Sequence, residues 1–442
     1  MHKNYKSIIQ NLYFLFIFLI PFQIYFNFFS AGFTPTLEEL ILITIFISIV
    51  LNIISNKKKL IIYRADILVY VFYVMIILSV MRATIDKNNI KFVLIWLLFF
   101  LAYFIPRYSI DTILDVRKSL TIIFLANAVL FLFAIFQFII GPENILDWIT
   151  GFFGKYFMDF NTVLERISQE NYHWRWNNTV KAFGTFVNVN TFCAYLGLSF
   201  PIALALCILT PNKKTKKLLF LYLTLNCIVI VLTFSRGGLL SGLFVAVYII
   251  LLLNKYIKLK TKLRITFMFI IVALIAYTVL HQVIDIMLMR LQTLDFSSNY
   301  ERILLWKGAW NVITDNMFFG VGVGNYEKII KYYLPLNAPI APAHNNILQL
   351  WAEVGLIGLS PFLLLILILM QQLIRISIHS SEYLIKSISA GLSGSFLWFL
   401  TQGMLSVFYF ELKYGMLFWL LIGITVVLIR KINKLQWYTG VL

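Results

Sequence analysis

The sequence predicts an all-α integral membrane protein, with one membrane domain over residues 1–442. Hydrophobic residues make up 61% of the chain and charged residues only 13%, a composition too apolar for a soluble domain of this length. Apolar runs of about 17 to 25 residues recur along the whole chain, and this is the length that a helix needs to cross a bilayer. The basic residues are unevenly distributed between these runs, which predicts the orientation of the helices.

We expect about 12 transmembrane helices. The apolar runs lie near 8–29, 37–55, 63–80, 91–105, 119–140, 188–210, 218–234, 237–254, 265–280, 346–374, 384–406 and 414–430. The first run is too long for the core of a signal peptide and lacks a small-residue cleavage site, so we expect it to remain as the first helix. With a cytoplasmic N-terminus, the inner segments hold 23 of the 37 Lys and Arg residues. The positive-inside rule therefore places both termini in the cytoplasm.

Several function classes are disfavoured by the same composition. The formal charge of +18 mostly reflects the orientation of the helices. The sequence shows no basic face outside the membrane, so it does not predict a nucleic-acid partner. The three cysteines lie in apolar runs without CxxC spacing, and HExxH and DxD motifs are absent. Glu38 and Glu39 could bind a divalent ion, but adjacent acidic residues at a helix start more often only balance the helix dipole. We expect no metal and no cofactor.

Two long loops face outward in this topology, at residues 141–187 and 281–345. Loops of this length in a compact protein are often functional. The second loop has five basic and five acidic residues, so an anion bound there must be met by individually placed cations. We expect the catalytic region in this second loop.

Arg236 in "TFSRGGLLSG" lies between two spans on the outer side. Arginine suits phosphate because its planar fork donates two parallel hydrogen bonds and stays charged. Gly237 and Gly238 begin the next helix, whose N-terminal amides also favour an anion. The alternative is an arginine that only anchors a helix end, and this stretch alone fits both interpretations.

The stretch "ERILLWKGAWNVI" in the second loop predicts a helix with Arg302, Trp306, Trp310 and Ile313 on one face. Taken alone, it is more typical of an interfacial helix whose tryptophans lie at the headgroups. The following "NMFFGVGVGNY" has three glycines that permit tight turns, and it lacks the context of a dinucleotide-binding loop.

His344 in "APAHNNILQLWAEVGLIGL" precedes the tenth span. Asn345 is a candidate N-cap, and the positive end of the helix dipole favours a neutral imidazole that can accept a proton. His344 is thus a candidate general base, although lone histidines more often only cap or hydrogen bond. Glu353 should be buried in the membrane, and we favour a structural role for it, as a partner of a hydroxyl or backbone group.

The first long loop contains an aromatic cluster in "NYHWRWNN" (171–178). Its rings, including that of Trp174, could stack on a substrate, and Arg175 could add a phosphate contact. The alternative is interfacial anchoring, which we favour for the tryptophans.

The order and spacing of these motifs resemble the O-antigen ligase and polymerase superfamily. The resemblance rests on "SRGG" at 235–238, on "R…W…A…G.G..NY" in the second loop, and on "HNNILQLWAEVGLIGL" after it. "AFGTFVNVNTFCAYLGLSFP" at 182–201 is similar to the family's entry to the sixth span. The resemblance covers residues 182–360, and the first 180 residues match only in hydropathy.

The resemblance implies a GT-C-like fold and a glycosyltransferase of the bacterial cell envelope. Such enzymes take a glycan from an undecaprenyl-diphosphate carrier and transfer it to an acceptor hydroxyl at the outer face of the inner membrane. Arg236 and Arg302 match the two arginines that hold the diphosphate, and His344 matches the histidine that activates the acceptor. We expect a metal-independent, inverting reaction, with Asn345, Trp306, Arg175 and Trp174 as further substrate contacts. Membrane lipids surround the chain.

Two functions are compatible with the resemblance to the superfamily, and two further functions would not belong to it. A polymerase adds glycan to another lipid-linked repeat, whereas an O-antigen ligase joins it to lipid A–core or to a protein. We favour the polymerase, because a chain rich in Lys, Ile and Asn is consistent with an AT-rich genome without conventional lipopolysaccharide. A transporter or flippase would need charged residues near the midplane of the bilayer and internal repeats. The sequence offers only Glu353 as such a charge and shows no repeat. A non-catalytic scaffold would not need the two arginines and the histidine.

Overall fold

The computed structural model describes residues 2–22, 35–57, 62–82, 86–141, 175–176, 179–186, 188–257, 297–336 and 338–439. Helices make up most of these residues, as the all-α prediction requires. The helices are α1 (His2–Leu19), α2 (Leu37–Ser55), α3 (Arg64–Val80), α4 (Lys87–Phe104), α5 (Pro106–Ser109), α6 (Ile113–Ile140), α10 (Val189–Leu209), α11 (Lys213–Leu232), α12 (Arg236–Leu253), η1 (Asn254–Tyr256), α14 (Ser297–Asp315), α15 (Tyr326–Ile330), α16 (Asn346–His379), α17 (Tyr383–Gly403) and α18 (Leu412–Thr439). The strands β1 (Arg175–Trp176) and β2 (Thr179–Val180) form one short antiparallel pair.

Nine helices in the described part of the chain are long and apolar enough to cross a membrane. Counted along the chain, they correspond to the second expected span (37–55), to the fourth to eighth (91–105 to 237–254) and to the tenth to twelfth (346–374 to 414–430). The first expected span corresponds to the shorter apolar helix α1, and the third to α3, which has 17 residues. The expected span at 265–280 lies outside the described residues. The chain is therefore an all-α membrane protein.

The centre of the bundle consists of α10 and the Leu412–Asn433 part of α18, and nearly every residue in their apolar stretches is buried by other helices. Glycines allow α17 to approach α10 closely, because a Cβ atom at Gly391 would lie 2.4 Å from the Cα atom of Ile202. Small residues commonly permit such contact between membrane helices. The outer helices α2, α3 and α12 instead expose large aliphatic side chains, as a lipid environment requires.

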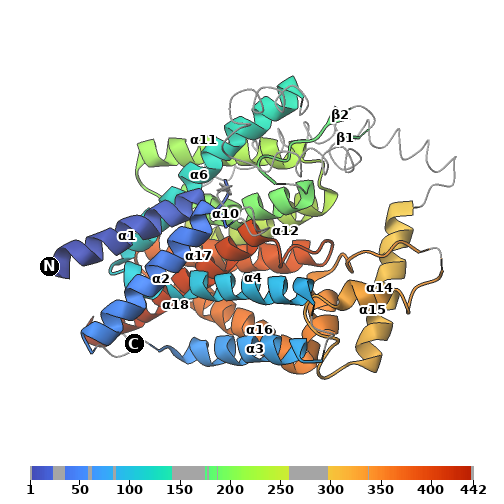
Figure 1. Ribbon diagram of the computed structural model, residues 1–442. Helices are drawn as coiled ribbons and strands as arrows, with labels where there is room; N and C mark the ends of the chain where they lie inside the picture. The colour runs from blue at the N-terminus through green and yellow to red at the C-terminus, as the bar shows by residue number, and fades with distance from the viewer. Residues whose placement is uncertain are drawn as a thin grey trace, which may run out of the picture.

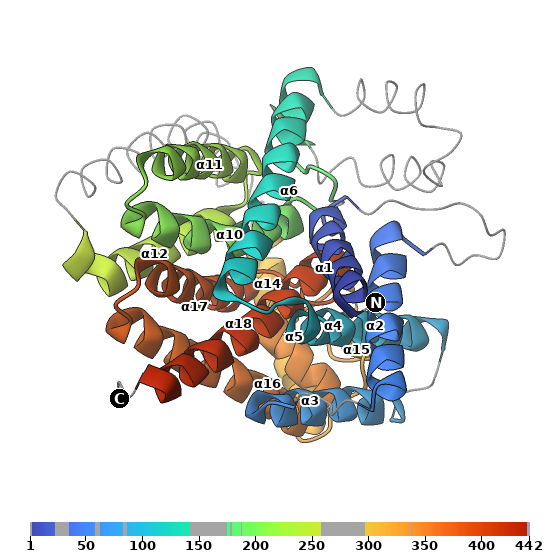
Figure 2. The same cartoon turned by 90° about the vertical axis from the view of Figure 1, so that its left-hand side faces the viewer.

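The described elements divide between two ends of the bundle (Figure 1). The start of α1 and the end of α18 lie at one end, at the left of Figure 1. Helices α14 and α15 lie at the opposite end, where α16 also begins. Figure 2 looks at the first end, with α6 crossing in front of α10 and with α14 and α15 behind the bundle. The described part of the predicted catalytic loop, which includes α14 and α15, therefore lies at one end of the bundle.

Candidate functional site

Arg236 is the first residue of α12, at a helix start that is fixed by its neighbours. Phe234 adopts a left-handed backbone conformation with φ of 56°, and Ser235 is the N-cap, whose Oγ accepts a hydrogen bond from Gly238 N at 3.3 Å. The Ser235 hydroxyl in turn donates to Asn190 Oδ1 at 2.8 Å. These contacts hold the half-buried Arg236 at the positive end of the helix.

Arg302 lies in α14 and is brought close to Arg236 by the tertiary fold. Burial lowers the pKa of the half-buried Arg302 guanidinium, and the positive charge of Arg236 lowers it further. No carboxylate in the described part of the chain forms a salt bridge with either arginine. Two unneutralised cations at one place form a site that favours an anion with more than one charge.

Trp306 follows Arg302 by one helical turn. Its ring is partly buried, and its Nε1 is buried without a hydrogen-bond partner among the described residues. Trp310, one turn further, is half exposed, and its ring meets that of Trp351 edge to face at 5.8 Å. The face predicted from the sequence thus has an unused N–H donor beside Arg302 and an aromatic contact to α16.

His344 is held in a strained turn immediately before α16. Its φ of 47° lies in the left-handed region, which is uncommon for residues other than glycine, although asparagine, aspartate and histidine adopt it more often than the rest. The preceding Ala343 is fully buried, and its N–H donates to Gln349 Oε1 at 2.9 Å. The imidazole is partly exposed, so it remains accessible at the same end of the bundle.

Asn345 is the N-cap of α16, as expected. Its Oδ1 accepts hydrogen bonds from Ile347 N at 3.0 Å and Leu348 N at 3.1 Å. This oxygen therefore has a structural role. The substrate contact that the sequence suggested would be made by the NH₂ group of the Asn345 side chain.

The connection between α17 and α18 links the starts of α12 and α16. Asn346 Oδ1 accepts from Phe408 N at 3.0 Å, and a Cβ atom at Gly403 would lie 2.7 Å from Asn346 Nδ2. On the other side, a Cβ atom at Gly237 would lie 3.3 Å from the Leu405 side chain. The segments that bear Arg236 and His344 therefore pack against one short connection.

Helix α16 is broken at Gly355, so the tenth expected span is not one continuous helix. Gly355 has φ of 69° and ψ of 178°, and the chain from Met317 to Gly322 pairs with the backbone at the break. Leu356 N donates to Met317 O at 2.8 Å, and Gly322 N donates to Glu353 O at 2.9 Å. Gly355 thus admits the backbone of this glycine-rich loop, because a Cβ atom there would lie 2.2 Å from Phe318 O.

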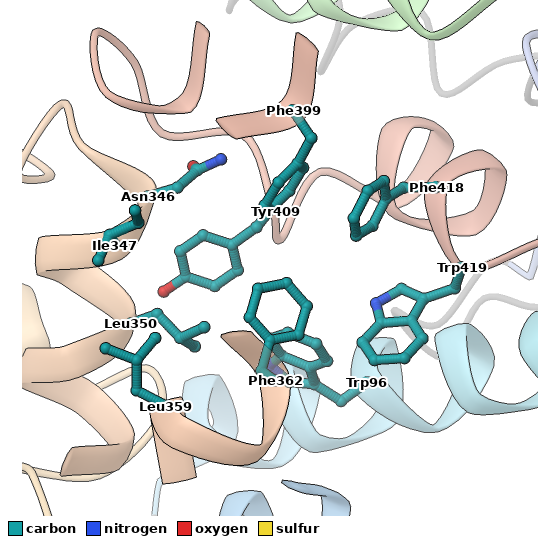
Figure 3. Close-up of a pocket in the computed structure, with 10 residues that line it drawn as sticks. All are labelled: Trp96, Asn346, Ile347, Leu350, Leu359, Phe362, Phe399, Tyr409, Phe418 and Trp419. Atoms are coloured by element: carbon teal, nitrogen blue, oxygen red, sulfur yellow. The ribbon is translucent and has the colours of Figure 1, made fainter. Parts of the chain in front are cut away.

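Glu353 is buried just before the break and has the two kinds of partner that the sequence suggested. Its Oε2 accepts from the Tyr409 hydroxyl at 2.9 Å, and the Gly324 N–H also hydrogen bonds to its carboxyl group. Beside Tyr409 lies a cavity of about 10 Å³, close to the space that one water molecule needs. Figure 3 shows the Tyr409 oxygen pointing toward the helix segment of Asn346, Ile347 and Leu350.

Glu38 and Glu39 do not form a common site. Glu39 Oε2 accepts from Thr36 N at 2.9 Å and so caps α2. Glu38 is fully buried and interacts electrostatically with Lys413, the second residue of α18. Within the described ranges, no group of three His, Cys, Asp or Glu side chains is placed to hold a metal ion.

The expected contacts from the first long loop are not placed at the site. Trp174 lies outside the described residues, and for Arg175 only the backbone is described, in β1 opposite Val180. Conversely, sequence reasoning missed Asn190, Gln349 and Tyr409. The sequence does contain a signal for Gln349: it lies four residues after Asn345 and four before Glu353, which places the three residues on one helix face.

Comparisons with known proteins agree with these motifs. Residues 218–363 match the family model described as O-antigen ligase, a segment that contains Arg236, Arg302 and His344. The teichuronic acid biosynthesis protein TuaE of Bacillus subtilis (strain 168) is 27% identical over 228 residues. That alignment covers 49% of this chain and 46% of TuaE, so the chain spans less than half the length of this relative.

Proposed function

Because residues 218–363 match the family model described as O-antigen ligase, we propose that this chain transfers glycan units from an undecaprenyl-diphosphate carrier to an acceptor sugar hydroxyl. The observation that carries the proposal is the meeting of Arg236 and Arg302, from distant parts of the chain, beside the segment that begins with His344. The reaction takes place at the outer face of the bacterial cytoplasmic membrane, and both termini are cytoplasmic.

Arg236 and Arg302 hold the diphosphate. Each guanidinium can donate two parallel hydrogen bonds to phosphate oxygens, and the N-terminal amides of α12 add to the positive field. The charge that develops on the diphosphate as its bond to the sugar breaks is stabilised by groups already in place. The lack of described carboxylate partners for both arginines supports this role.

His344 activates the acceptor. Its imidazole takes the proton of the acceptor hydroxyl, whose oxygen attacks the anomeric carbon of the donor sugar. The bond between that carbon and the diphosphate oxygen breaks, and undecaprenyl diphosphate leaves with the electron pair. One displacement inverts the anomeric configuration and requires neither a metal nor a covalent intermediate.

Trp306 and Asn345 contact the substrates. The unpartnered Nε1 of Trp306 suits a donor to an oxygen of the diphosphate or of the first sugar, because it lies one turn from Arg302. Arg175 and Trp174 stay candidates for sugar or phosphate contacts from the first long loop.

The product is a polysaccharide chain, which makes the protein a polymerase. The similarity to a Bacillus protein of teichuronic acid biosynthesis favours this reading over the ligase that joins O-antigen to lipid A–core. Both functions use the same donor chemistry and differ in the acceptor.

The test uses the full chain in nanodiscs, with undecaprenyl-diphosphate repeat units and EDTA. A ladder of lipid-linked products that disappears in His344→Ala supports a metal-independent polymerase. Donor consumption only after a lipid or protein acceptor is added would identify a ligase. If a competent donor is not consumed under either condition, the glycosyltransferase proposal is wrong and transport becomes the better explanation.

A further inference from the structure

We infer that Glu353 and Gln349, which are both almost fully buried, are positioning residues that fix His344 for proton transfer. The inference rests on the proposed function of His344 as general base. It starts from a buried hydrogen-bonded chain that runs backward along the first part of α16, from the helix break to the residue before His344.

The first link joins Gln349 to the turn of His344. Gln349 is almost fully buried, and its Oε1 accepts the N–H of Ala343 at 2.9 Å. Ala343 is fully buried and directly precedes His344. The position of this backbone N–H therefore determines where the turn places the imidazole.

The second link joins Gln349 to Glu353, one helical turn later. The Gln349 side chain hydrogen bonds to the Glu353 carboxyl group. Since Gln349 uses its oxygen for Ala343, its NH₂ group must be the donor to Glu353. A carboxylate accepts only, so Glu353 selects the one orientation of the Gln349 amide that can hold Ala343.

The third link ties Glu353 to two other segments. Its side chain accepts from the Tyr409 hydroxyl at 2.9 Å, and its backbone oxygen accepts from Gly322 N at 2.9 Å. In Figure 3, Tyr409 approaches the start of α16 from the opposite side of the cavity. Glu353 is thus held between the glycine-rich loop and the connection that follows α17.

His344 needs such support because of its backbone. A residue other than glycine with φ of 47° is strained and persists only when its surroundings hold it there. Asn345 fixes the turn from the C-terminal side as the helix cap. Gln349 fixes it from the N-terminal side through Ala343, and Glu353 fixes Gln349.

The test measures kcat and donor KM in the nanodisc assay for Gln349→Met, Glu353→Gln and the double variant, each also in the His344→Ala background. Glutamine at position 353 has about the same shape but can donate or accept, so it no longer selects the orientation of Gln349. We expect each single variant to lower kcat by at least tenfold with donor KM within twofold of wild type. The double variant should be no slower than the slower single variant, because both act through one chain. With His344→Ala, neither change should lower kcat further.

Tyr409→Phe is the matched control, since it removes a different hydrogen bond to Glu353 and leaves the link to Gln349. It should lower kcat less than Glu353→Gln does. Hydrogen exchange gives a readout without turnover: Gln349→Met should speed exchange of the Ala343 amide at least tenfold, and Tyr409→Phe should leave it within twofold of wild type.

The outcomes separate this inference from the proposed function. If His344→Ala is inactive but Gln349→Met keeps wild-type kcat, only the positioning inference is wrong. The inference is also wrong if Gln349→Met and Glu353→Gln lower kcat by the same factor in the His344→Ala background as in the wild-type background. It is wrong, too, if the exchange rate of the Ala343 amide is the same in Gln349→Met as in wild type. If His344→Ala is fully active, the general-base role fails and the positioning role fails with it.

Discussion

At the scale of single residues, the site combines two arginines and a partly exposed histidine with a buried indole N–H that has no hydrogen-bond partner among the described residues. Burial lowers the pKa of Arg302, and the charge of Arg236 lowers it further, so each arginine raises the free energy of the other in its charged form. A bound diphosphate would remove this repulsion. The geometry is therefore costly to the free protein and favourable in the complex with an anion.

Arg236→Lys and Arg302→Lys test the role of the guanidinium forks. Lysine keeps the charge but cannot form the bidentate contact, so we expect donor KM to rise about tenfold in each variant, which corresponds to about 1.4 kcal/mol. Steady-state kinetics in nanodiscs measure it. Arg117→Lys, at an exposed arginine of α6, is the control and should leave KM unchanged. Full activity of both site variants would contradict bidentate phosphate binding.

His344→Asn tests the base more cleanly than His344→Ala. Asparagine tolerates the left-handed conformation of residue 344, so the turn should survive while the proton acceptor is lost. We expect kcat to fall by roughly 10²–10⁴-fold in both variants, with thermal stability closer to wild type for asparagine. A variant with near-normal kcat would show that another group takes the proton.

Trp306→Phe tests the unpartnered indole N–H. Phenylalanine keeps the aromatic ring in α14 but has no donor, and a hydrogen bond to a charged group contributes about 1.5–3 kcal/mol. We expect donor KM to rise by about tenfold or more at that magnitude, with unchanged expression in the membrane. An unchanged KM would favour the interfacial-anchor interpretation of this tryptophan.

At the scale of elements, the break in α16 separates the part that presents His344 from the part that spans the bundle. Gly355 makes it possible, because a Cβ atom there would lie 2.2 Å from Phe318 O in a backbone conformation with φ of 69°. The glycine-rich loop fills the gap and takes over the backbone hydrogen bonds. A sequence pattern cannot reveal this, since residues 346–374 form one uninterrupted apolar run.

Gly355→Ala should destabilise the protein by at least about 2 kcal/mol, from the strained backbone and the clash together. The unfolding midpoint in detergent would fall accordingly. Gly242→Ala is the control, since its φ is not positive and its added Cβ would meet only the Trp398 ring at 3.2 Å. Equal midpoints for Gly355→Ala and wild type would mean that the break at Gly355 is absent.

At the scale of the whole molecule, α14, which bears Arg302 and Trp306, lies at the same end of the bundle as the start of α16, which follows His344 and Asn345 (Figure 1). The basic residues that set the orientation include the first turn of α11. If the positive-inside rule holds, the site faces outward, where a lipid-linked glycan that has crossed the membrane is available.

Cysteine labelling tests this orientation. Lys331, after α15, and Lys214, in the first turn of α11, are both exposed, and the three native cysteines are buried. In intact cells, a membrane-impermeant maleimide should label Lys331→Cys but not Lys214→Cys, which should react only after permeabilisation. The reverse pattern would place the site in the cytoplasm and overturn the proposed acceptor chemistry.

The sequence by itself determined the membrane class, most of the helix boundaries and the residues to suspect. Bilayer thickness imposes the length of each apolar run, and local chemistry identifies the helix cap Asn345. These are short-range effects, so they can be read from neighbouring residues.

Only the tertiary structure decided which of these residues meet. The closeness of Arg236 and Arg302, the break at Gly355 and the links from Glu353 to Tyr409 and Gly322 all depend on contacts between segments far apart in sequence or on backbone strain. A helical pattern predicts the face on which a side chain lies, but not its partner. The partner is decided by how the glycines of the loop and of α17 allow the backbones to approach.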